Sequence, residues 1–415
     1  MSRSPLPATP RDCDSRSPIS LIPGHWKATK FGYHFRESDE RNGDSPPGPL
    51  LSISEYRGIE LNTRTDGQKA SHDVSSYRVV RPNQLAANMM WLNHGGIGVS
   101  SLTGYVSPDY KVFWISEHFE PRYVHHLFRS SRYIGYFAAV ATGVRPNAQR
   151  VTKAVLDATP LPFPPFTEQV YIADYLDRET GHIDALLGKM DELAALLVSR
   201  LAGLKENALA KIPERRALRW MVPQISTGPF GTQVKQGDYI SDGVPLINPS
   251  HIVGGRLAPD SKTTVSEAKA TELDRFALSA EDVVVARRGE FGRCAVVREA
   301  DTPAICGTGS LRVRSDPAVA LPEFVQLVVS SPDAIRELEQ LSVGATMGNL
   351  NERLLGEVSV PVTSIHEQKA VLKYIDEVTG RIEAMLSKVA ELKSLLLERR
   401  SALITDVVTG RKQVS

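Results

Sequence analysis

The sequence predicts an α+β protein in which two globular domains are separated by two long helices that form an antiparallel coiled coil. Three observations lead to this prediction: a helical segment that occurs twice, prolines at the start of each copy, and short β-type runs in the region before each copy. The chain has 415 residues, which at ~100–200 residues per domain allows roughly two to four domains. The repeat gives the chain a pseudo-two-fold internal symmetry.

The repeated segment aligns residues 162–204 with residues 361–403 without a gap, at a constant offset of 199 residues. Of the 43 aligned positions, 17 are identical, including a Glu-Gln pair near the start and a Thr-Gly pair further on. Chance does not produce this agreement. The prolines end the structure that precedes each copy, and the glutamate suits the positive end of a helix dipole.

Apolar residues recur within each copy at steps of three and four, which predicts an apolar seam along each helix. Because the chain carries two such helices, we expect the two seams to pack on each other. The predicted seam residues are Ile183, Leu186, Met190, Leu193 and Leu197 in the first copy and Ile382, Met385, Val389, Leu392 and Leu396 in the second.

Short β-type runs and turn signals fill the regions before each helix, which indicates two α+β domains of about 140–150 residues. Each domain carries a late glycine, Gly143 or Gly344, followed by a turn with an asparagine. The domains therefore look like divergent versions of one module. The predicted boundaries are a flexible leader at 1–19, a first domain at 20–160, a first helix at 161–211, a second domain at 212–360, a second helix at 361–410 and a tail at 411–415.

Composition narrows the class of protein. No run approaches the ~18 apolar residues of a membrane span, and the polar, proline-rich start of the chain lacks the apolar core of a signal peptide. The cysteines Cys13, Cys294 and Cys306 have no Cys-x-x-Cys spacing, which predicts a reducing compartment and no structural zinc. We therefore expect a cytoplasmic protein that does not contact a membrane.

Motifs for catalysis are missing from the sequence. The nearest approach to a DNA amino-methyltransferase tetrapeptide, at residues 248–251, lacks the second proline and the aromatic residue. A P-loop lysine motif, a nuclease core and a Gly-x-Ser-x-Gly elbow are also absent. The histidines His118, His125 and His126 have no cysteine or acidic partner at ligand spacing. We expect no catalytic, cofactor or metal site.

Charge is nearly balanced, with 49 Lys and Arg residues against 48 Asp and Glu residues. This balance argues against tight, non-specific DNA binding by the chain alone, because phosphate neutralisation supplies most of that affinity. It is compatible with a DNA-reading chain whose partner subunits help to hold the DNA. Residues 1–160, with 19 basic and 14 acidic residues, are mildly basic.

The repeated helix with its Glu-Gln start and the Val-Thr-Gly at residues 408–410 resemble the specificity subunit of Type I restriction-modification systems. The resemblance extends over nearly the whole chain from about Pro23. The Gly-His-Trp at residues 24–26 is similar to the family's opening, and residues 104–110 are similar to its first recognition domain. The glycine pair Gly289 and Gly292 is similar to that of its second.

The resemblance implies a non-catalytic DNA-specificity subunit. Each globular domain would read half of a split target in the major groove of double-stranded DNA, and the coiled coil would space the halves. Two modification subunits that bind S-adenosylmethionine would dock on this chain, and restriction subunits would supply the ATP-driven motor and the Mg²⁺-dependent nuclease. None of these cofactors would belong to the chain itself.

Candidate DNA-contacting residues are arginine, asparagine, glutamine and lysine near glycine-rich turns, because these side chains read base edges and phosphates. In the first domain they are Asn93, His94, Tyr105, Lys111, Arg145, Asn147 and Gln149. In the second domain they are Gln233, Lys235, Arg287, Arg288, Arg293, Asn349 and Asn351.

Two alternatives stay open on the residues alone. One is a protein–protein scaffold in which the helices form a dimer and the globular domains bind proteins. The other is a methyltransferase or nuclease whose site the motifs do not reveal. Weak DNA binding in the presence of a modification partner would favour the first, and activity of the purified chain would favour the second.

Overall fold

The computed structural model describes residues 17–19, 22–43, 45–54, 58–63, 73–142, 150–230, 233–342 and 350–414. The chain divides into two compact units. Unit 1 comprises Met1–Asp191 and Ala390–Ser415, and unit 2 comprises Glu192–Val389. Two long helices, α5 (Phe166–Ala210) and α10 (Ile365–Val408), each begin in one unit and end in the other. No helix in the described ranges is long and apolar enough to cross a membrane.

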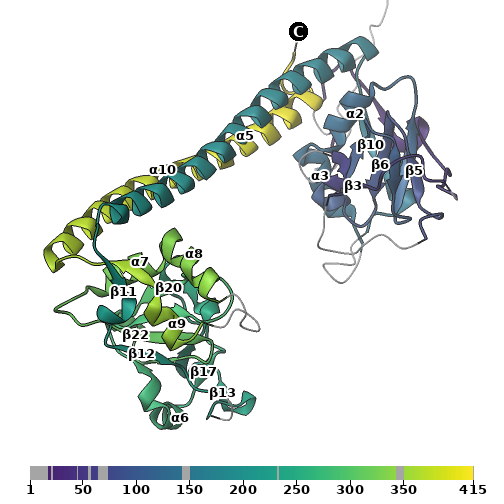
Figure 1. Cartoon of the computed structure of the whole chain (residues 1–415). Coiled ribbons are helices and arrows are strands. Elements are labelled where there is room, and N and C mark those ends of the chain that lie inside the picture. The colour runs from purple at the N-terminus through teal and green to yellow at the C-terminus, as the bar shows by residue number, and fades with distance from the viewer. Residues whose placement is uncertain are drawn as a thin grey trace, which may run out of the picture. The chain divides into compact units, whose positions relative to one another are not determined.

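The part of unit 1 that comes before α5 is a mixture of short strands and helices (Figure 1). Its elements are β1 (Lys27–Lys30), α1 (Phe31–His34), β2 (Phe35–Glu37), β3 (Leu51–Ser54), β4 (Gly58–Leu61), β5 (Arg78–Val80), β6 (Gln84–Asn88), η1 (Leu92–His94), β7 (Ile97–Val99), β8 (Gly104–Val106), β9 (Tyr110–Ile115), α2 (Pro121–Phe128), α3 (Ser131–Val140), α4 (Lys153–Ala158) and β10 (Pro160–Phe163).

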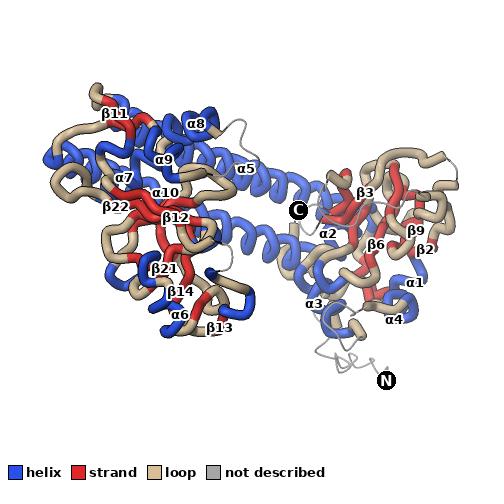
Figure 2. The backbone as a smooth tube through the Cα atoms, turned by 60° about the horizontal axis from the view of Figure 1, so that its bottom comes forward, coloured by secondary structure: helices blue, strands red, loops and turns tan. Residues whose placement is uncertain are grey.

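Unit 2 combines many short strands with short helices (Figure 2). Its elements are β11 (Arg215–Ala217), η3 (Leu218–Trp220), β12 (Gln224–Thr227), η5 (Gln236–Asp238), β13 (Tyr239–Ile240), β14 (Val244–Ile247), η6 (Pro249–His251), β15 (Ile252–Val253), β16 (Arg256–Leu257), β17 (Thr264–Val265), α6 (Glu267–Glu272), η7 (Asp274–Phe276), β18 (Ala277–Leu278), β19 (Val283–Ala286), β20 (Cys294–Val296), η8 (Glu299–Asp301), β21 (Ala304–Cys306), β22 (Ser310–Arg314), α7 (Pro322–Val329), α8 (Pro332–Leu341), α9 (Glu352–Glu357) and β23 (Ser359–Pro361).

The two units share one topology, which confirms the predicted α+β fold with an internal repeat. The central sheet of unit 1 has the strand order β2-β9-β6-β7, and that of unit 2 has the matching order β12-β22-β19-β20, with antiparallel pairing in both. Each sheet is followed by three helices and then by a strand that leads into a long helix. Unit 2 adds a second sheet, of order β13-β17-β14-β21-β18, between β12 and β22.

Different side chains fill the two cores. Unit 1 packs aromatic rings around Phe31, whose ring is stacked on Phe35 at 4.2 Å and meets Phe113 edge-on at 5.1 Å. The corresponding core of unit 2 is mainly aliphatic, with Leu218 and Val329 buried at its centre. Residues from the long helices enter both cores, so each domain is built around its end of the helix pair.

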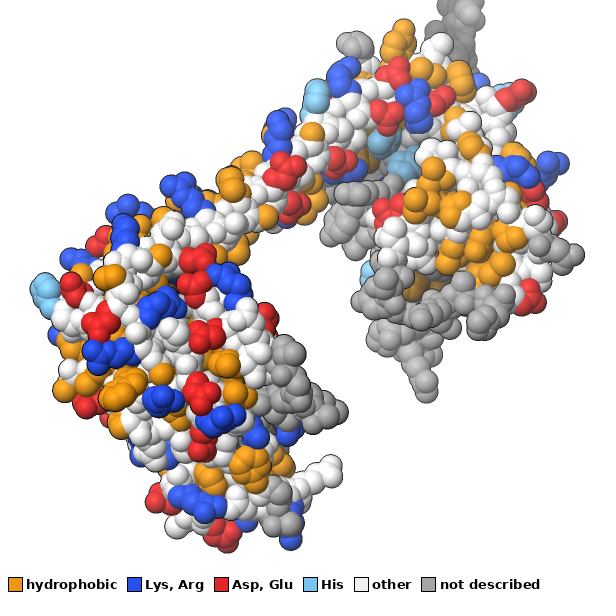
Figure 3. Space-filling view, viewed as in Figure 1, with side chains coloured by type: hydrophobic (Ala, Val, Ile, Leu, Met, Phe, Trp, Pro, Cys, Tyr) orange, Lys and Arg blue, Asp and Glu red, His pale blue; other side chains and the backbone are white. Residues whose placement is uncertain are grey.

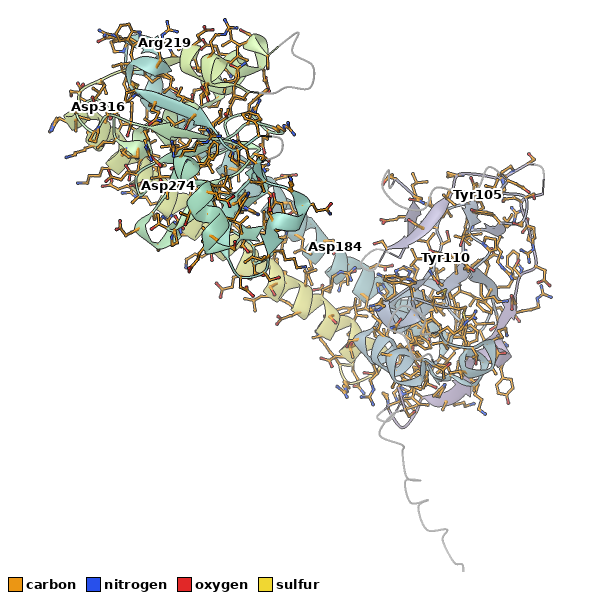
Figure 4. All side chains as sticks on the ribbon, turned by 90° about the horizontal axis from the view of Figure 1, so that it is seen from below. Tyr105, Tyr110, Asp184, Arg219, Asp274 and Asp316 are labelled. Atoms are coloured by element: carbon orange, nitrogen blue, oxygen red, sulfur yellow. The ribbon has the colours of Figure 1, made fainter. Side chains whose placement is uncertain are left out.

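The long helices pair in an antiparallel sense. In unit 1, Arg400 donates to both carboxylate oxygens of Asp184 at 3.0 and 3.3 Å, and Lys393 forms an ion pair with Asp191. The partners on α10 descend by seven residues as those on α5 ascend by seven, which is one heptad of an antiparallel coiled coil. Figure 4 labels Asp184 on α5. Within the described part of unit 2, no ion pair joins the two helices.

Burial divides the predicted seam into two sets. The members that lie inside the helix pair, buried or half-buried, are Ile183, Met190, Leu197, Ile382, Val389 and Leu396. The members that remain exposed are Leu186, Leu193, Met385 and Leu392. A residue three positions further along a helix is rotated by about 60° around the axis, so two helices alone cover one set and leave the other facing outward.

A buried glutamine fastens each domain to its long helix. Gln169 and Gln368, the second residues of the repeated Glu-Gln pair, are both 0% exposed. Gln169 accepts from the Glu120 amide at 3.0 Å and donates to the carbonyls of His118 and Pro164 at 3.1 and 3.0 Å.

Gln368 repeats this arrangement in unit 2. It accepts from the Leu321 amide at 2.9 Å and donates to the carbonyls of Val319 and Thr363 at 2.8 and 2.9 Å. In both units the segment fastened in this way leads into the first of the three helices that follow the central sheet, α2 or α7. The repeated dipeptide therefore has a structural role, which is to lock the domain onto the helix start.

Replacement of either glutamine by leucine should destabilise the unit that contains it. The change removes three hydrogen bonds and leaves backbone groups without partners, and each such group costs about 1–3 kcal/mol. We expect Gln169→Leu and Gln368→Leu each to lower the free energy of unfolding by about 3 kcal/mol, measured by urea denaturation. Gln340→Leu, on the exposed face of α8, is the matched control. Equal stability of all three variants would contradict the assigned role.

Candidate nucleic-acid interface

The interface candidates centre on one hairpin turn in each unit. The first hairpin turn, residues 89–96, connects β6 to β7, and the second hairpin turn, residues 287–293, connects β19 to β20. Because the sheets have the same strand order, the two turns occupy equivalent places. The sequence prediction had selected residues in both turns without any basis for regarding them as equivalents.

A second loop adjoins each turn at the same point. In unit 1 the amide of Val151 donates to the carbonyl of Met89 at 3.0 Å, and in unit 2 the amide of Leu350 donates to the carbonyl of Arg287 at 3.0 Å. These amides follow closely on residues 143–149 and 343–349, which lie outside the described residues and include the candidates Arg145, Asn147, Gln149 and Asn349. The fold thus places Val151 and Leu350 beside the hairpin turns.

Glycines shape both turns. Gly289 and Gly292 have φ angles of 86° and 78°, and Gly95 has a φ of 75°. These left-handed conformations favour glycine because a Cβ would clash with the backbone. The turn expected around Arg288 is therefore present, and each turn carries polar side chains at the end of a strand pair.

An aromatic side chain stands at the surface beside each turn. Trp91 is 56% exposed, and its ring lies 5.0 Å from that of His94. Phe230 is 49% exposed, and the guanidinium of Arg287 lies 4.7 Å from its ring. Neither Trp91 nor Phe230 was among the sequence candidates. The available signal was a large apolar residue inside a short segment that contains two glycines.

Arg287 has an unused hydrogen-bond donor. Its Nε donates to the carbonyl of Leu350 at 2.9 Å, while its Nη1 is buried and has no acceptor among the described residues. Burial and the neighbouring Arg288 lower the pKa of Arg287. A guanidinium held in this way has an N–H free to donate to an anionic or carbonyl group. Arg288 itself is exposed.

Other candidates already have partners in the fold. Arg293 donates to Glu290 at 2.8 Å and Lys111 to Glu37 at 2.6 Å. The side chain of Asn351 caps α9 by accepting from the Leu354 amide at 2.9 Å. Gln233 accepts from the backbone amide of Phe230 at 2.8 Å.

The remaining candidates lie at separate places. Tyr105 is on β8 and meets Tyr77 edge-on at 5.7 Å, and Figure 4 labels it together with Tyr110 at the start of β9. Lys235 is exposed just before η5. Asn93 is half-buried in η1 within the first hairpin turn. The structure thus gathers Asn93 and His94 in one cluster and Arg287, Arg288 and Gln233 in another.

Comparison with known proteins identifies relatives, although no protein-family model matches the chain. The chain is 25% identical over 297 residues to the EcoBI Type I restriction enzyme specificity subunit of Escherichia coli, covering 64% of this chain and 62% of the relative. It is 23% identical over 305 residues to the EcoKI specificity subunit of Escherichia coli strain K12, covering 67% and 64%. These matches span less than two thirds of the relatives' length.

A solved structure has the same fold. A chain from a study of complex assembly and conformational transition of the Type I restriction-modification system aligns with a TM-score of 0.66 and 15% sequence identity, over 94% of this chain and 98% of that one. This chain is therefore similar in sequence to the specificity subunits of Type I restriction enzymes, and it shares the fold of a chain from such a system.

Proposed function

We propose that this chain is the non-catalytic DNA-specificity subunit of a Type I restriction-modification complex and reads a two-part target in double-stranded DNA. The observation that carries this proposal is the duplicated hairpin turn. In unit 1 it carries the exposed Trp91 beside His94, and in unit 2 it carries Arg287, whose guanidinium lies against the exposed ring of Phe230 from the loop after β12. The relatives' names agree with this assignment. We also propose a cytoplasmic location, because the complex would need access to its target DNA.

Direct reading of bases would use the hairpin turns and the adjoining loops. Arginine recognises guanine, and asparagine or glutamine recognises adenine, through paired hydrogen bonds in the major groove. Arg287 and Arg288 supply the donors in unit 2, and Asn93 and His94 supply polar groups in unit 1. Phosphate contacts from other basic residues would set the register of each domain without adding sequence information.

The exposed half of the helix seam supports the docking of modification subunits. Leu186 and Leu392 in unit 1, and Leu193 and Met385 in unit 2, leave apolar surface on both parts of the helix pair, and Figure 3 shows hydrophobic side chains among the charged ones on these helices. An apolar stripe on a helix pair fits helices of a partner. We propose two modification subunits, which bind S-adenosylmethionine, and restriction subunits that use ATP and Mg²⁺.

The proposal is tested by selecting DNA from a random duplex library at ~150 mM salt. The purified chain alone should enrich no motif, should transfer no methyl group from S-adenosylmethionine and should not cleave DNA with Mg²⁺. The same chain with its modification subunit should enrich a two-part motif. Specific binding or methyl transfer by the isolated chain would refute the assignment, and failure of the complex to bind DNA would favour a protein scaffold.

Variants locate the reading surface within this experiment. Trp91→Ala should weaken one half of the motif, with about tenfold less discrimination at one or two positions, a loss within the ~1–3 kcal/mol that one base contact contributes. Trp114→Ala is the matched control. Trp114 is also exposed, but it lies on β9 opposite Gln84, the residue of β6 that is farthest from the first hairpin turn. Equal effects of the two variants would place the reading surface elsewhere.

A further inference from the structure

A pocket in unit 2 lies where the end of α5 meets the start of α10. It has a volume of about 630 Å³. Its lining includes Ile212, Pro213, Val362, Glu367, Val371 and Tyr374. Glu214 also lines the pocket, but it already accepts from Arg216 at 2.8 Å. The apolar wall and the Glu367 carboxylate therefore suit a ligand group that is largely apolar and carries one hydrogen-bond donor.

The equivalent surface of unit 1 is occupied. The repeat matches Glu367 with Glu168, and in unit 1 the indole of Trp26 covers that residue. Trp26 is 6% exposed and donates from Nε1 to Oε1 of Glu168 at 3.0 Å, and it packs in one cluster with Ile172, the counterpart of Val371. The other oxygen of Glu168 lies 3.1 Å from Nε2 of His25.

Strand register shows why unit 2 lacks this occupant. Ala28 pairs with Pro162, and Arg215 pairs with Pro361. Because these two prolines are repeat equivalents, Trp26 corresponds to Pro213. A proline side chain has no donor and fills far less space than an indole, so the site stays open where the chain passes from α5 to β11.

Glu367 keeps one oxygen available for a ligand. The hydroxyls of Thr363 and Ser364 both donate to its Oε2, and no described residue donates to its Oε1. These hydrogen bonds lower the pKa of Glu367, so it is ionised at neutral pH. In unit 1 the matching positions are Pro164 and Pro165, which offer no hydroxyl, and the tryptophan supplies the donor instead. Tyr374 is 45% exposed at the rim of the pocket.

We propose that this pocket binds a tryptophan side chain presented by a second polypeptide. The indole N–H donates to Oε1 of Glu367, and the ring packs against Val362 and Val371 as Trp26 packs in unit 1. Tryptophan fits because its side chain combines a large apolar surface with a donor and no acceptor. The proposal goes beyond DNA reading and does not depend on it, since the pocket needs no DNA to form.

A peptide from this chain provides the probe. Residues 22–27, which contain Trp26, are synthesised and titrated into the full chain while the methyl signals of Val362 and Val371 are followed by NMR. We expect saturable shifts of these signals, and at least tenfold weaker binding for the Trp26→Ala peptide, as for an aromatic anchor at an interface. Absence of shifts at several millimolar peptide, or equal binding of both peptides, would overturn the proposal.

Variants of the pocket test the binding mode. Pro213→Trp should fill the pocket from within the chain and reduce peptide affinity at least tenfold, whereas Pro223→Trp, at an exposed position outside the pocket, should not. Glu367→Leu removes the carboxylate that would accept from the indole N–H, so it should also weaken peptide binding. Circular dichroism checks that this variant is folded. Unchanged affinity in a folded Pro213→Trp or Glu367→Leu variant would contradict the assignment. The assay contains no DNA, so its outcome is separate from that of the proposed function.

Discussion

Replacing residues 20–160 with the corresponding domain of another specificity subunit is expected to change one half of the DNA target and leave the other half unchanged. The physical reason is local attachment. Each domain is fastened to its own helix start by a buried glutamine, Gln169 or Gln368, and has its own core. The measurement is the motif enriched from a random library by the exchanged chain with its modification subunit.

The reciprocal exchange, of residues 212–360, is the matched control and should alter the other half. Both exchanged chains should keep the same spacer length, because the long helices are untouched. Loss of both halves in a chain that remains folded and binds the modification subunit would show that the domains do not read independently.

Insertion of one heptad into both long helices, after Leu193 and after Leu392, is expected to lengthen the spacer between the half-sites by about three base pairs. Seven residues add ~10 Å to a helix, and DNA rises ~3.4 Å per base pair. A heptad preserves the pairing register, because the ion pairs of Asp184 and Asp191 with α10 are themselves one heptad apart.

The helical twist of the DNA determines how tightly the heptad variant binds its target. Three base pairs turn the duplex by roughly 100° at ~10.5 base pairs per turn, so one domain meets a displaced groove and binding should weaken. A five-residue insertion is the control, because it rotates Leu197 and Leu396 away from the partner helix and should destabilise the pair. An unchanged spacer with full affinity in the heptad variant would show that the helices do not set the distance.

The long helices could be predicted closely from sequence because their signal is local and occurs twice. The predicted ranges 161–211 and 361–410 contain α5 and α10, and each helix runs on through its Thr-Gly pair without ending. Sequence could not predict which seam residues are buried and which are exposed, since residues three or four positions apart both lie near one face of a helix. Which of them is covered depends on the number of helices in the bundle.

The likeness of the two domains was only weakly visible in the sequence because their cores use different side chains. Phe31 in unit 1 corresponds to Leu218 in unit 2, since each donates its amide to the residue before the matching strand, and Phe128 corresponds to Val329 at the end of equivalent eight-residue helices. Backbone topology survives such exchanges when the packing of the whole core adjusts. A residue-by-residue alignment does not detect them.

Candidate DNA contacts could be predicted as clusters but not as individual residues. Sequence supplies the identity of Arg293, Lys111 and Asn351, but only the fold shows that each already has a partner. Trp91 and Phe230 were missed because an exposed aromatic residue cannot be distinguished from a core residue by its type alone. Only the fold shows that Trp91 lies exposed in the first hairpin turn and that Phe230 lies exposed against Arg287.

The pattern of DNA methylation in a host that expresses this chain with its modification subunit is the most direct test of two-domain DNA reading. We expect single-molecule sequencing to find methylation at one motif that consists of two short defined half-sites separated by a non-specific spacer of constant length. A host that lacks this chain should show no methylation at that motif. Methylation at a single uninterrupted sequence, or at sites that do not change when this chain is removed, would contradict the proposed function.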